Sequence, residues 1–208
     1  MEIPILYSDK EIAVCLKPAG TDSEAGLPAL LSRELNVQEV FCVHRLDRDV
    51  GGVMVYALTR PAAAFLSREI QAGLFRKEYL AVIHGAPERD AAELRDLLFH
   101  DRAKNKSYVV KRPRAGVKEA ALDYRLLGQC QGLSLLAVRL RTGRTHQIRV
   151  QFSSRSHPLV GDTRYGSPRR DADIALYSHA LGFTHPKTRE ALRFTAPPPP
   201  VFPWDLFF

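Results

Sequence analysis

The sequence predicts an α+β fold built on a largely antiparallel, mixed β-sheet flanked by helices. Segments with strand character outnumber segments with helical spacing, and short turns join most neighbouring strands, as in hairpins. The chain has 208 residues, of which 45% are apolar and 25% charged, so it can bury a core without disulfides or metals. We expect one domain over residues 1–208, with a Pro-rich C-terminal tail (197–208) that packs against it.

The first half of the chain predicts a hairpin followed by two helices that flank a strand. The hairpin comprises residues 3–7 and 12–16, and helical spacing appears at 28–35. Residues 53–58 are rich in apolar and β-branched side chains, which predicts a buried strand. A helix follows from residue 60 to about 72, with Thr59 as its N-cap.

The second half predicts more paired strands and one short helix. A strand is expected at 79–83, paired strands at 122–127 and 133–140, and a final pair at 175–184 and 191–195. Thr145 is expected to cap a short helix from 146 to about 152. The intervening segment 102–118 is expected to be a basic loop.

The chain is basic, with a formal net charge of +7 and an isoelectric point near 9.5. The positive side chains gather in residues 102–118, 139–149 and 166–170. Such clustering is typical of proteins that bind an anionic partner, and nucleic acid is the commonest one. For residues 102–118 an ordinary solvated surface loop remains an equal alternative.

Several classes of protein lack support in the sequence. Motifs that cradle nucleotides are absent, and the seven histidines lack metal-ligand spacing. The three cysteines form no CxxC pair, and no segment has the pattern of a signal peptide or a membrane span. We therefore expect a cytoplasmic protein without a metal, a cofactor or membrane contact.

The stretch VHRLDRDVGG (residues 43–52) places Asp47 between two arginines, beside His44 and ahead of paired glycines. Alone, this pattern is typical of a polar turn. Other stretches accompany it in order: KPAG (17–20), RKEYLA (76–81), RTGRTHQIR (141–149), HPLVGD (157–162) with YG (165–166), SHA (178–180) and FTAP (194–197). Together they closely resemble the motifs of the RluA-type pseudouridine synthases, from about residue 3 to 197.

The resemblance implies a pseudouridine synthase fold with a central RNA-binding cleft, and isomerisation of a specific uridine in structured ribosomal or transfer RNA. The reaction detaches the base from C1′, turns it and rejoins it through C5, without redox chemistry, ATP or metal. Many relatives carry a small RNA-binding domain in front, whereas this chain begins at the predicted catalytic hairpin, so we expect a minimal, monomeric member.

The same resemblance assigns three catalytic residues. Asp47 is the catalytic carboxylate, which attacks C1′ or C6 or helps to expel the base. Arg149 is the cation paired with it, because burial disfavours a charged carboxylate and a nearby cation opposes that effect. Tyr79 stacks on the base and takes or relays the C5 proton.

A second set of residues is expected to contact RNA: Arg45, His44, Lys77, Arg141, Arg144, His146 and Gln147. The flat guanidinium of Arg45 can fill the space left by a flipped uridine. His44 is also expected to support the loop by hydrogen bonding. The glycines at 51 and 52 are expected to allow a sharp turn and a close approach of the backbone to the substrate.

The chain departs from the family pattern at Val50 and Gly51, where relatives usually have Thr-Ser, so two hydroxyls beside Asp47 are missing. A catalytically inactive RNA-binding module of the same fold is the main alternative, although such a module needs no Asp47, Tyr79 and Arg149. A base-excising hydrolase is a third possibility, but it generally needs a second carboxylate, and nothing aims Asp49 at the same centre.

Overall fold

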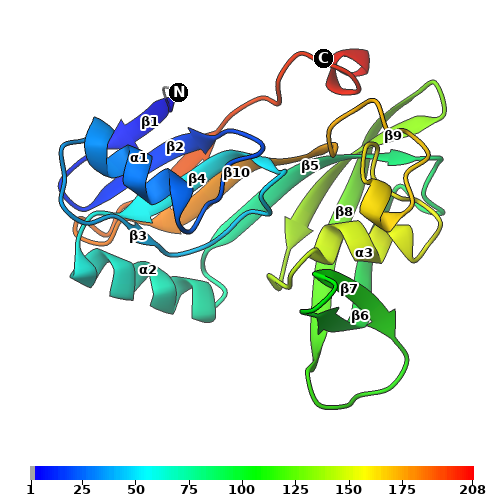
Figure 1. Cartoon of the computed structure of the whole chain (residues 1–208), viewed down its shortest axis with the longest axis horizontal. Helices are drawn as coiled ribbons and strands as arrows, with labels where there is room; N and C mark the ends of the chain where they lie inside the picture. Colours follow the sequence, from blue (N-terminus) through cyan, green and yellow to red (C-terminus); the bar gives the residue numbers. More distant parts are fainter. Residues whose placement is uncertain (1–2) are drawn as a thin grey trace. The chain divides into compact units, whose positions relative to one another are not determined.

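The computed structural model describes residues 3–208, which divide into two compact units. The first unit contains residues 3–78 and Tyr177–Pro198, and the second contains Tyr79–Leu176 and Pro199–Phe208. The boundaries fall inside two strands, β5 (Arg76–His84) and β10 (Leu176–Thr184) (Figure 1). Strands predominate in both units, and most of the strand pairs are antiparallel, as the sequence predicts.

The first unit is built around strand β4 (Gly51–Ala57). It pairs antiparallel with β2 (Ile12–Lys17), which forms the predicted hairpin with β1 (Ile5–Ser8). On its other side β4 runs parallel to β10, which pairs in turn with β11 (Ala191–Thr195); the short β3 (Phe41–Cys42) also pairs with β4.

Two helices complete this unit, α1 (Gly26–Glu34) and α2 (Arg60–Gln71). The side chain of Thr59 accepts a hydrogen bond from the Ala62 N–H, which confirms Thr59 as the N-cap of α2. Leu66 of α2 is fully buried against the apolar side chains of β2, β4 and β10. This packing fixes the strand that immediately follows the Asp47 loop.

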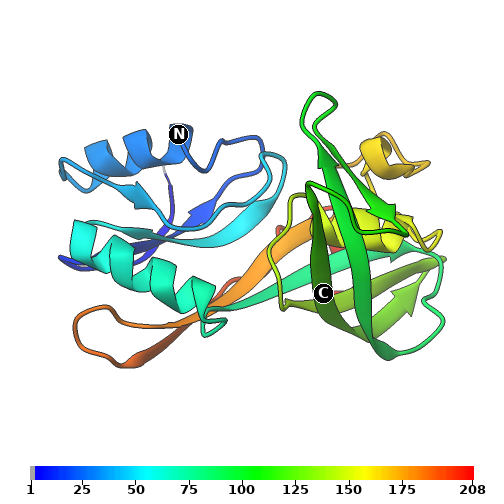
Figure 2. The same ribbon diagram turned by 90° about the horizontal axis from the view of Figure 1, so that it is seen from below.

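In the second unit the strands follow the order β5, β9 (Leu133–Leu140), β8 (Val117–Cys130), β6 (Ala91–Asp101), β7 (Lys106–Val110). The helix α3 (Gln147–Ser153; yellow in Figure 2) and the 3-10 turns η1 (Thr163–Tyr165) and η2 (Trp204–Leu206) belong to the same unit. The tail packs here as predicted, because Trp204 is buried and the Phe202 ring lies beneath the Arg169 guanidinium.

Two sequence predictions are wrong in this unit. Strands β6 and β7 form a hairpin where no strands were predicted, so the basic segment 102–118 is a loop only in part. The β6 sequence AAELRDLLFHD is rich in helix-forming residues, and its pairing with β8 overrides that preference. Thr145 does not cap α3; the N-cap is His146, with φ of 54° and no side-chain cap bond.

Within residues 3–208, no helix is long and apolar enough to span a membrane. The same residues contain no group of three or more His, Cys, Asp or Glu side chains that could hold a metal ion.

Candidate active site

A buried lysine holds the backbone of the Asp47 loop. Lys17, at the end of β2, is only 2% exposed, and its ammonium donates hydrogen bonds to the carbonyl oxygens of Pro18 (3.0 Å), Arg48 (2.9 Å) and Val50 (2.8 Å). Asp47 itself closes a turn, since its carbonyl accepts the Val50 N–H at 3.0 Å. The loop is therefore fixed immediately after the carboxylate, by a residue that the KPAG stretch supplies.

Burial lowers the pKa of Lys17 to about 8, against the opposing attraction of the Asp49, Asp22 and Asp47 carboxylates. The ammonium is still charged at neutral pH. Hydrogen bonds from a charged donor are stronger than neutral ones, so three of them to loop carbonyls strongly restrict the loop. Sequence analysis predicts only a turn at Lys17, although the KPAG match was a signal for a larger role.

His44 ties the start of the same loop to β4. Its Nε2 atom accepts the Val55 N–H at 3.2 Å, and its ring lies 5.2 Å from the ring of Phe75. Burial, helped by the charge of Lys77, holds the pKa of His44 well below its usual range, so the imidazole is neutral. These contacts support the structural role expected for His44, and its contact with RNA stays a prediction.

Gly52 is required by the approach of β4 to β10. Its φ is +123°, and a Cβ at this position would collide with the backbone oxygen of Ser178, its partner in the parallel register. Gly52 therefore makes its close approach to a neighbouring strand, and the approach to the substrate expected of the glycine pair stays a prediction. Val50, which replaces the usual Thr, is buried with 1% exposure.

Arg45 projects from the loop into solvent. Its guanidinium pairs with Glu24 at 2.7 Å, and the two side chains are 61% and 55% exposed. An ion pair this exposed is weak and is readily exchanged for another partner. The side chain is thus free to leave Glu24 for a base or a phosphate.

Strand β5 carries both Lys77 and Tyr79. Two residues apart on a strand, they point to the same face. The Lys77 ammonium lies 5.4 Å from the centroid of the Phe75 ring, and burial lowers its pKa to about 8. Tyr79 is 6% exposed.

Arg149 is held by a carboxylate that sequence reasoning did not select. Its Nε and Nη2 atoms donate to Oδ2 and Oδ1 of Asp162 at 2.7 and 2.9 Å. The two side chains are 4% and 1% exposed, so the pair is fully desolvated. Asp162 belongs to the HPLVGD stretch, which was matched as a motif without a role for its acid. The bidentate pair fixes the plane of the guanidinium.

His146 and Gln147 make internal contacts at the start of α3. The His146 ring is 8% exposed, and its Nδ1 lies 3.0 Å from the Tyr165 hydroxyl. The Gln147 amide oxygen accepts from the Thr142 hydroxyl and the Arg144 N–H, while its nitrogen donates to the Ala121 carbonyl. Gln147 thereby fixes the TGR turn to β8, and its expected contact with RNA is a prediction that these bonds do not support.

Arg141 and Arg144 remain closer to solvent. Arg141 forms a bidentate pair with Asp123 (2.8 and 2.9 Å) and also contacts Glu93 at 3.1 Å. The Arg144 Nε donates to the Glu119 carbonyl at 2.9 Å. Because these contacts are exposed, both cations can still face a phosphate.

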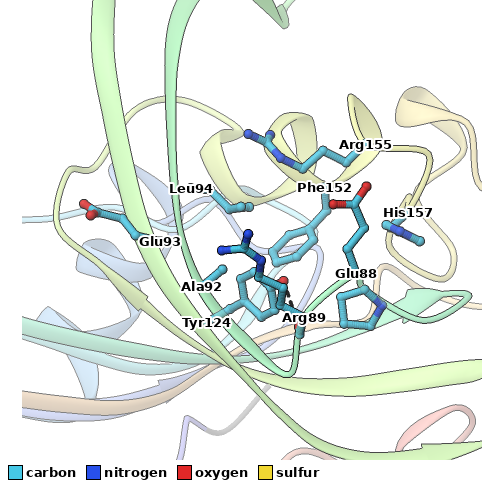
Figure 3. A pocket seen from close by; sticks show the side chains of 10 residues that line it. Glu88, Arg89, Ala92, Glu93, Leu94, Tyr124, Phe152, Arg155 and His157 are labelled. Atoms are coloured by element: carbon cyan, nitrogen blue, oxygen red, sulfur yellow. Dashed lines mark hydrogen bonds between the residues drawn. The ribbon is translucent and has the colours of Figure 1, made fainter.

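A pocket of about 280 Å³ in the second unit contains none of the predicted catalytic or RNA-binding residues (Figure 3). The Tyr124 and Phe152 rings lie edge to face within it, 5.4 Å apart, and Arg155 borders it beyond the C-terminal end of α3. Its lining also includes Pro87, Glu88, Arg89, Ala92, Glu93, Leu94 and His157. We do not assign the active site to this pocket.

Seven of the ten predicted site residues thus form two groups, while Lys77 and Tyr79 lie on β5 and Arg141 lies just beyond the end of β9. His44, Arg45 and Asp47 lie on one loop of the first unit, held by Lys17. Arg144, His146, Gln147 and Arg149 lie at the start of α3 in the second unit, held mainly by Asp162, Tyr165 and β8.

A family model described as RNA pseudouridylate synthase matches residues 8–154. The chain belongs to this family. Among the curated relatives, the uncharacterized RNA pseudouridine synthase YlyB of Bacillus subtilis is 31% identical and the match covers 96% of this chain and 70% of the relative. Ribosomal large subunit pseudouridine synthase D of Xanthomonas campestris is 35% identical, with 94% and 66% coverage. The chain spans between 56% and 70% of the length of the relatives compared.

Two solved pseudouridine synthase structures show the same fold. Human RNA pseudouridylate synthase domain containing 1 has a TM-score of 0.80 at 23% identity and covers 96% of this chain and 85% of its own. Domain containing 4 has a TM-score of 0.79 at 22% identity, with 93% and 87% coverage. The predicted family and fold class are confirmed.

Proposed function

We propose that this pseudouridine synthase family member isomerises a specific uridine to pseudouridine in structured RNA. One observation carries the proposal: the carboxylate of Asp47 sits on a loop whose carbonyls at Arg48 and Val50 are both held by the buried ammonium of Lys17. A surface turn used only for binding needs no such internal clamp. A carboxylate that must meet a single reacting carbon does.

In the proposed reaction the N1–C1′ bond of uridine breaks and a C5–C1′ bond forms. Asp47 attacks C1′ or C6, or assists departure of the base. Tyr79 takes or relays the proton that C5 loses, and N1 gains a proton, so the product is an isomer of the substrate. The family motifs pair the cation of Arg149 with Asp47, and Asp162 fixes Arg149. The joint action of these residues on one uridine rests on the family motifs.

RNA contacts in this proposal come from the cations. Arg45 fills the space vacated by the flipped uridine, and Lys77, Arg141 and Arg144 contact the backbone. The substrate is ribosomal or transfer RNA. The curated relatives named as ribosomal large subunit synthases favour ribosomal RNA. We further propose that the protein acts as a cytoplasmic monomer.

The alternative is a family member that binds RNA without catalysis. The internal clamp on the Asp47 loop and the buried pair at Arg149 favour catalysis, because both restrict side chains that pure binding does not require.

The test is pseudouridine mapping of ribosomal and transfer RNA from cells with and without this gene. We expect one or more pseudouridines to disappear on deletion and to return with the wild-type gene, but not with the Asp47→Asn variant. Identical maps with and without the gene would overturn the proposal. Return of the modification with Asp47→Asn would overturn the role of Asp47.

A further inference from the structure

Tyr165 lies at the centre of a buried network in the second unit. It ends η1 and is 5% exposed. Its hydroxyl accepts the backbone N–H of Ser107 at 2.7 Å and lies 3.0 Å from the Nδ1 atom of His146. Burial raises the pKa of Tyr165, so the phenol keeps its proton and can donate it to His146 while its oxygen accepts from Ser107.

The face of the same ring meets Arg149. The guanidinium carbon of Arg149 lies 5.1 Å from the ring centroid, within the range of a cation–π interaction. Asp162 grips the edge of the guanidinium, and the Tyr165 N–H donates to the Asp162 carbonyl at 3.1 Å. One short segment therefore holds Arg149 in two ways, through a carboxylate and through a ring.

The hydroxyl of Tyr165 contacts strand β7 of the β6–β7 hairpin, through Ser107. Ser107 donates its N–H to Tyr165 and its hydroxyl to the Thr145 carbonyl at 2.6 Å. The ring of Tyr165 is thus fixed at its far end by an element distant in sequence from both Asp162 and Arg149. A phenylalanine would keep the ring and lose this anchor.

We propose that Tyr165 is a positioning residue for Arg149, in which the ring supports the face of the guanidinium whose edge Asp162 holds, and the hydroxyl fixes the ring. No role for Tyr165 beyond a matched motif follows from the sequence. Its effect on catalysis rests on the function proposed above, whereas its effect on the guanidinium does not.

The first test measures single-turnover pseudouridine formation and RNA affinity separately. We expect Tyr165→Phe to slow the chemical step several-fold and Tyr165→Leu to slow it about tenfold or more, the scale of one desolvated cation–π contact. The dissociation constant for RNA should stay within about twofold of wild type, a change in binding free energy smaller than that of one hydrogen bond.

Tyr124→Phe is the matched control, because Tyr124 is buried in the same unit, packs on Phe152 of α3 and donates its hydroxyl to the Arg89 carbonyl at 3.0 Å. It should leave the rate unchanged.

Two kinetic outcomes would overturn the proposal. One is a wild-type rate for Tyr165→Phe, the variant that decides the question if Tyr165→Leu fails to fold. The other is weaker RNA binding by the Tyr165 variants with an unchanged rate of the chemical step. Tyr165 would then support the β6–β7 hairpin and would not position Arg149.

The second test needs no RNA and stands even if the wild-type protein proves inactive. In ¹⁵N-labelled full-length protein, the Nε–H resonance of Arg149 is identified by its loss in Arg149→Lys. We expect slow exchange with solvent in wild type and in Tyr124→Phe, and exchange about tenfold faster in Tyr165→Phe, as for a group that opens more often. Equal exchange rates in all three proteins would overturn the positioning role.

Discussion

Arg149 and Asp162 form a bidentate ion pair that is almost completely removed from solvent. Removing one partner of such a buried pair is strongly destabilising, at a cost of about 3–5 kcal/mol. We therefore expect Asp162→Asn to lower the free energy of unfolding by about that amount, measured by urea denaturation at neutral pH.

The exposed bidentate pair of Arg141 and Asp123 provides the matched control. Asp123→Asn should cost about 1 kcal/mol or less, because solvent screens the pair. If both substitutions lower the free energy of unfolding by the same amount, burial would not make the Arg149–Asp162 pair more important for stability than an exposed pair.

The titration of Lys17 should appear in the pH dependence of stability. Its pKa is about 8 in the folded protein and near the ordinary 10.5 when unfolded, so unfolding takes up a proton between these values. Below pH 8 the buried Lys17 ammonium lowers the free energy of unfolding by its full desolvation cost. This cost disappears as the pH rises from about 8 to 10.5, so the folded protein becomes more stable. Relative to Lys17→Met, wild type should gain about 3 kcal/mol between pH 7.5 and 10.5.

The comparison uses denaturation of both proteins at several pH values. Lys77 also titrates near pH 8, but it is present in both proteins, so its contribution cancels in the difference. A difference that does not change with pH would mean that the three carbonyl acceptors keep the ammonium charged throughout.

Gly52 should not tolerate a side chain. In Gly52→Ala the methyl group meets the Ser178 backbone at a φ of +123°, so we expect a loss of at least about 2 kcal/mol or failure to fold. Gly73→Ala separates the two causes, because Gly73 has a φ of +72° but open space around its Cβ position. It should lose only about 1 kcal/mol, and equal losses would mean that backbone conformation alone, without the collision, explains the glycine.

Arg45 should matter most for folded RNA. If its guanidinium fills the gap left by the flipped uridine, Arg45→Ala should reduce kcat/KM about 10- to 100-fold on a folded substrate, equivalent to about 1–3 kcal/mol of stacking. The loss should be small on a linear strand, which has little stacking to break. Arg45→Lys should restore little, because an ammonium cannot stack as a plane. Equal losses on the two substrates would make Arg45 a general phosphate contact.

The sequence was informative where local chemistry decides the structure. The hairpin at the N-terminus, the N-cap Thr59 and the strand after the Asp47 loop follow from turn residues, capping residues and apolar patterning. Strands β6 and β7 could not be predicted in this way. The helix-forming composition of β6 is overridden by its pairing with β8, a strand distant in the sequence.

The site shows the same division. The motifs supplied Asp47, Tyr79 and Arg149 as candidates from residue identity alone. The supports of Asp47 and Arg149, namely Lys17, Asp162 and Tyr165, depend on contacts between residues 13 to 58 positions apart in the chain. Their motifs were visible, but nothing in a linear sequence says which buried carbonyl or guanidinium each one meets.

The central claim is that Asp47 performs the chemistry and does not merely bind RNA. The most direct measurement incubates the purified wild-type and Asp47→Asn proteins with ribosomal RNA from cells that lack the gene, and follows pseudouridine formation and RNA affinity together. We expect wild type to convert uridine to pseudouridine without releasing free uracil, and Asp47→Asn to bind the RNA with comparable affinity but to form no product. Product formation by Asp47→Asn within tenfold of the wild-type rate would contradict the account.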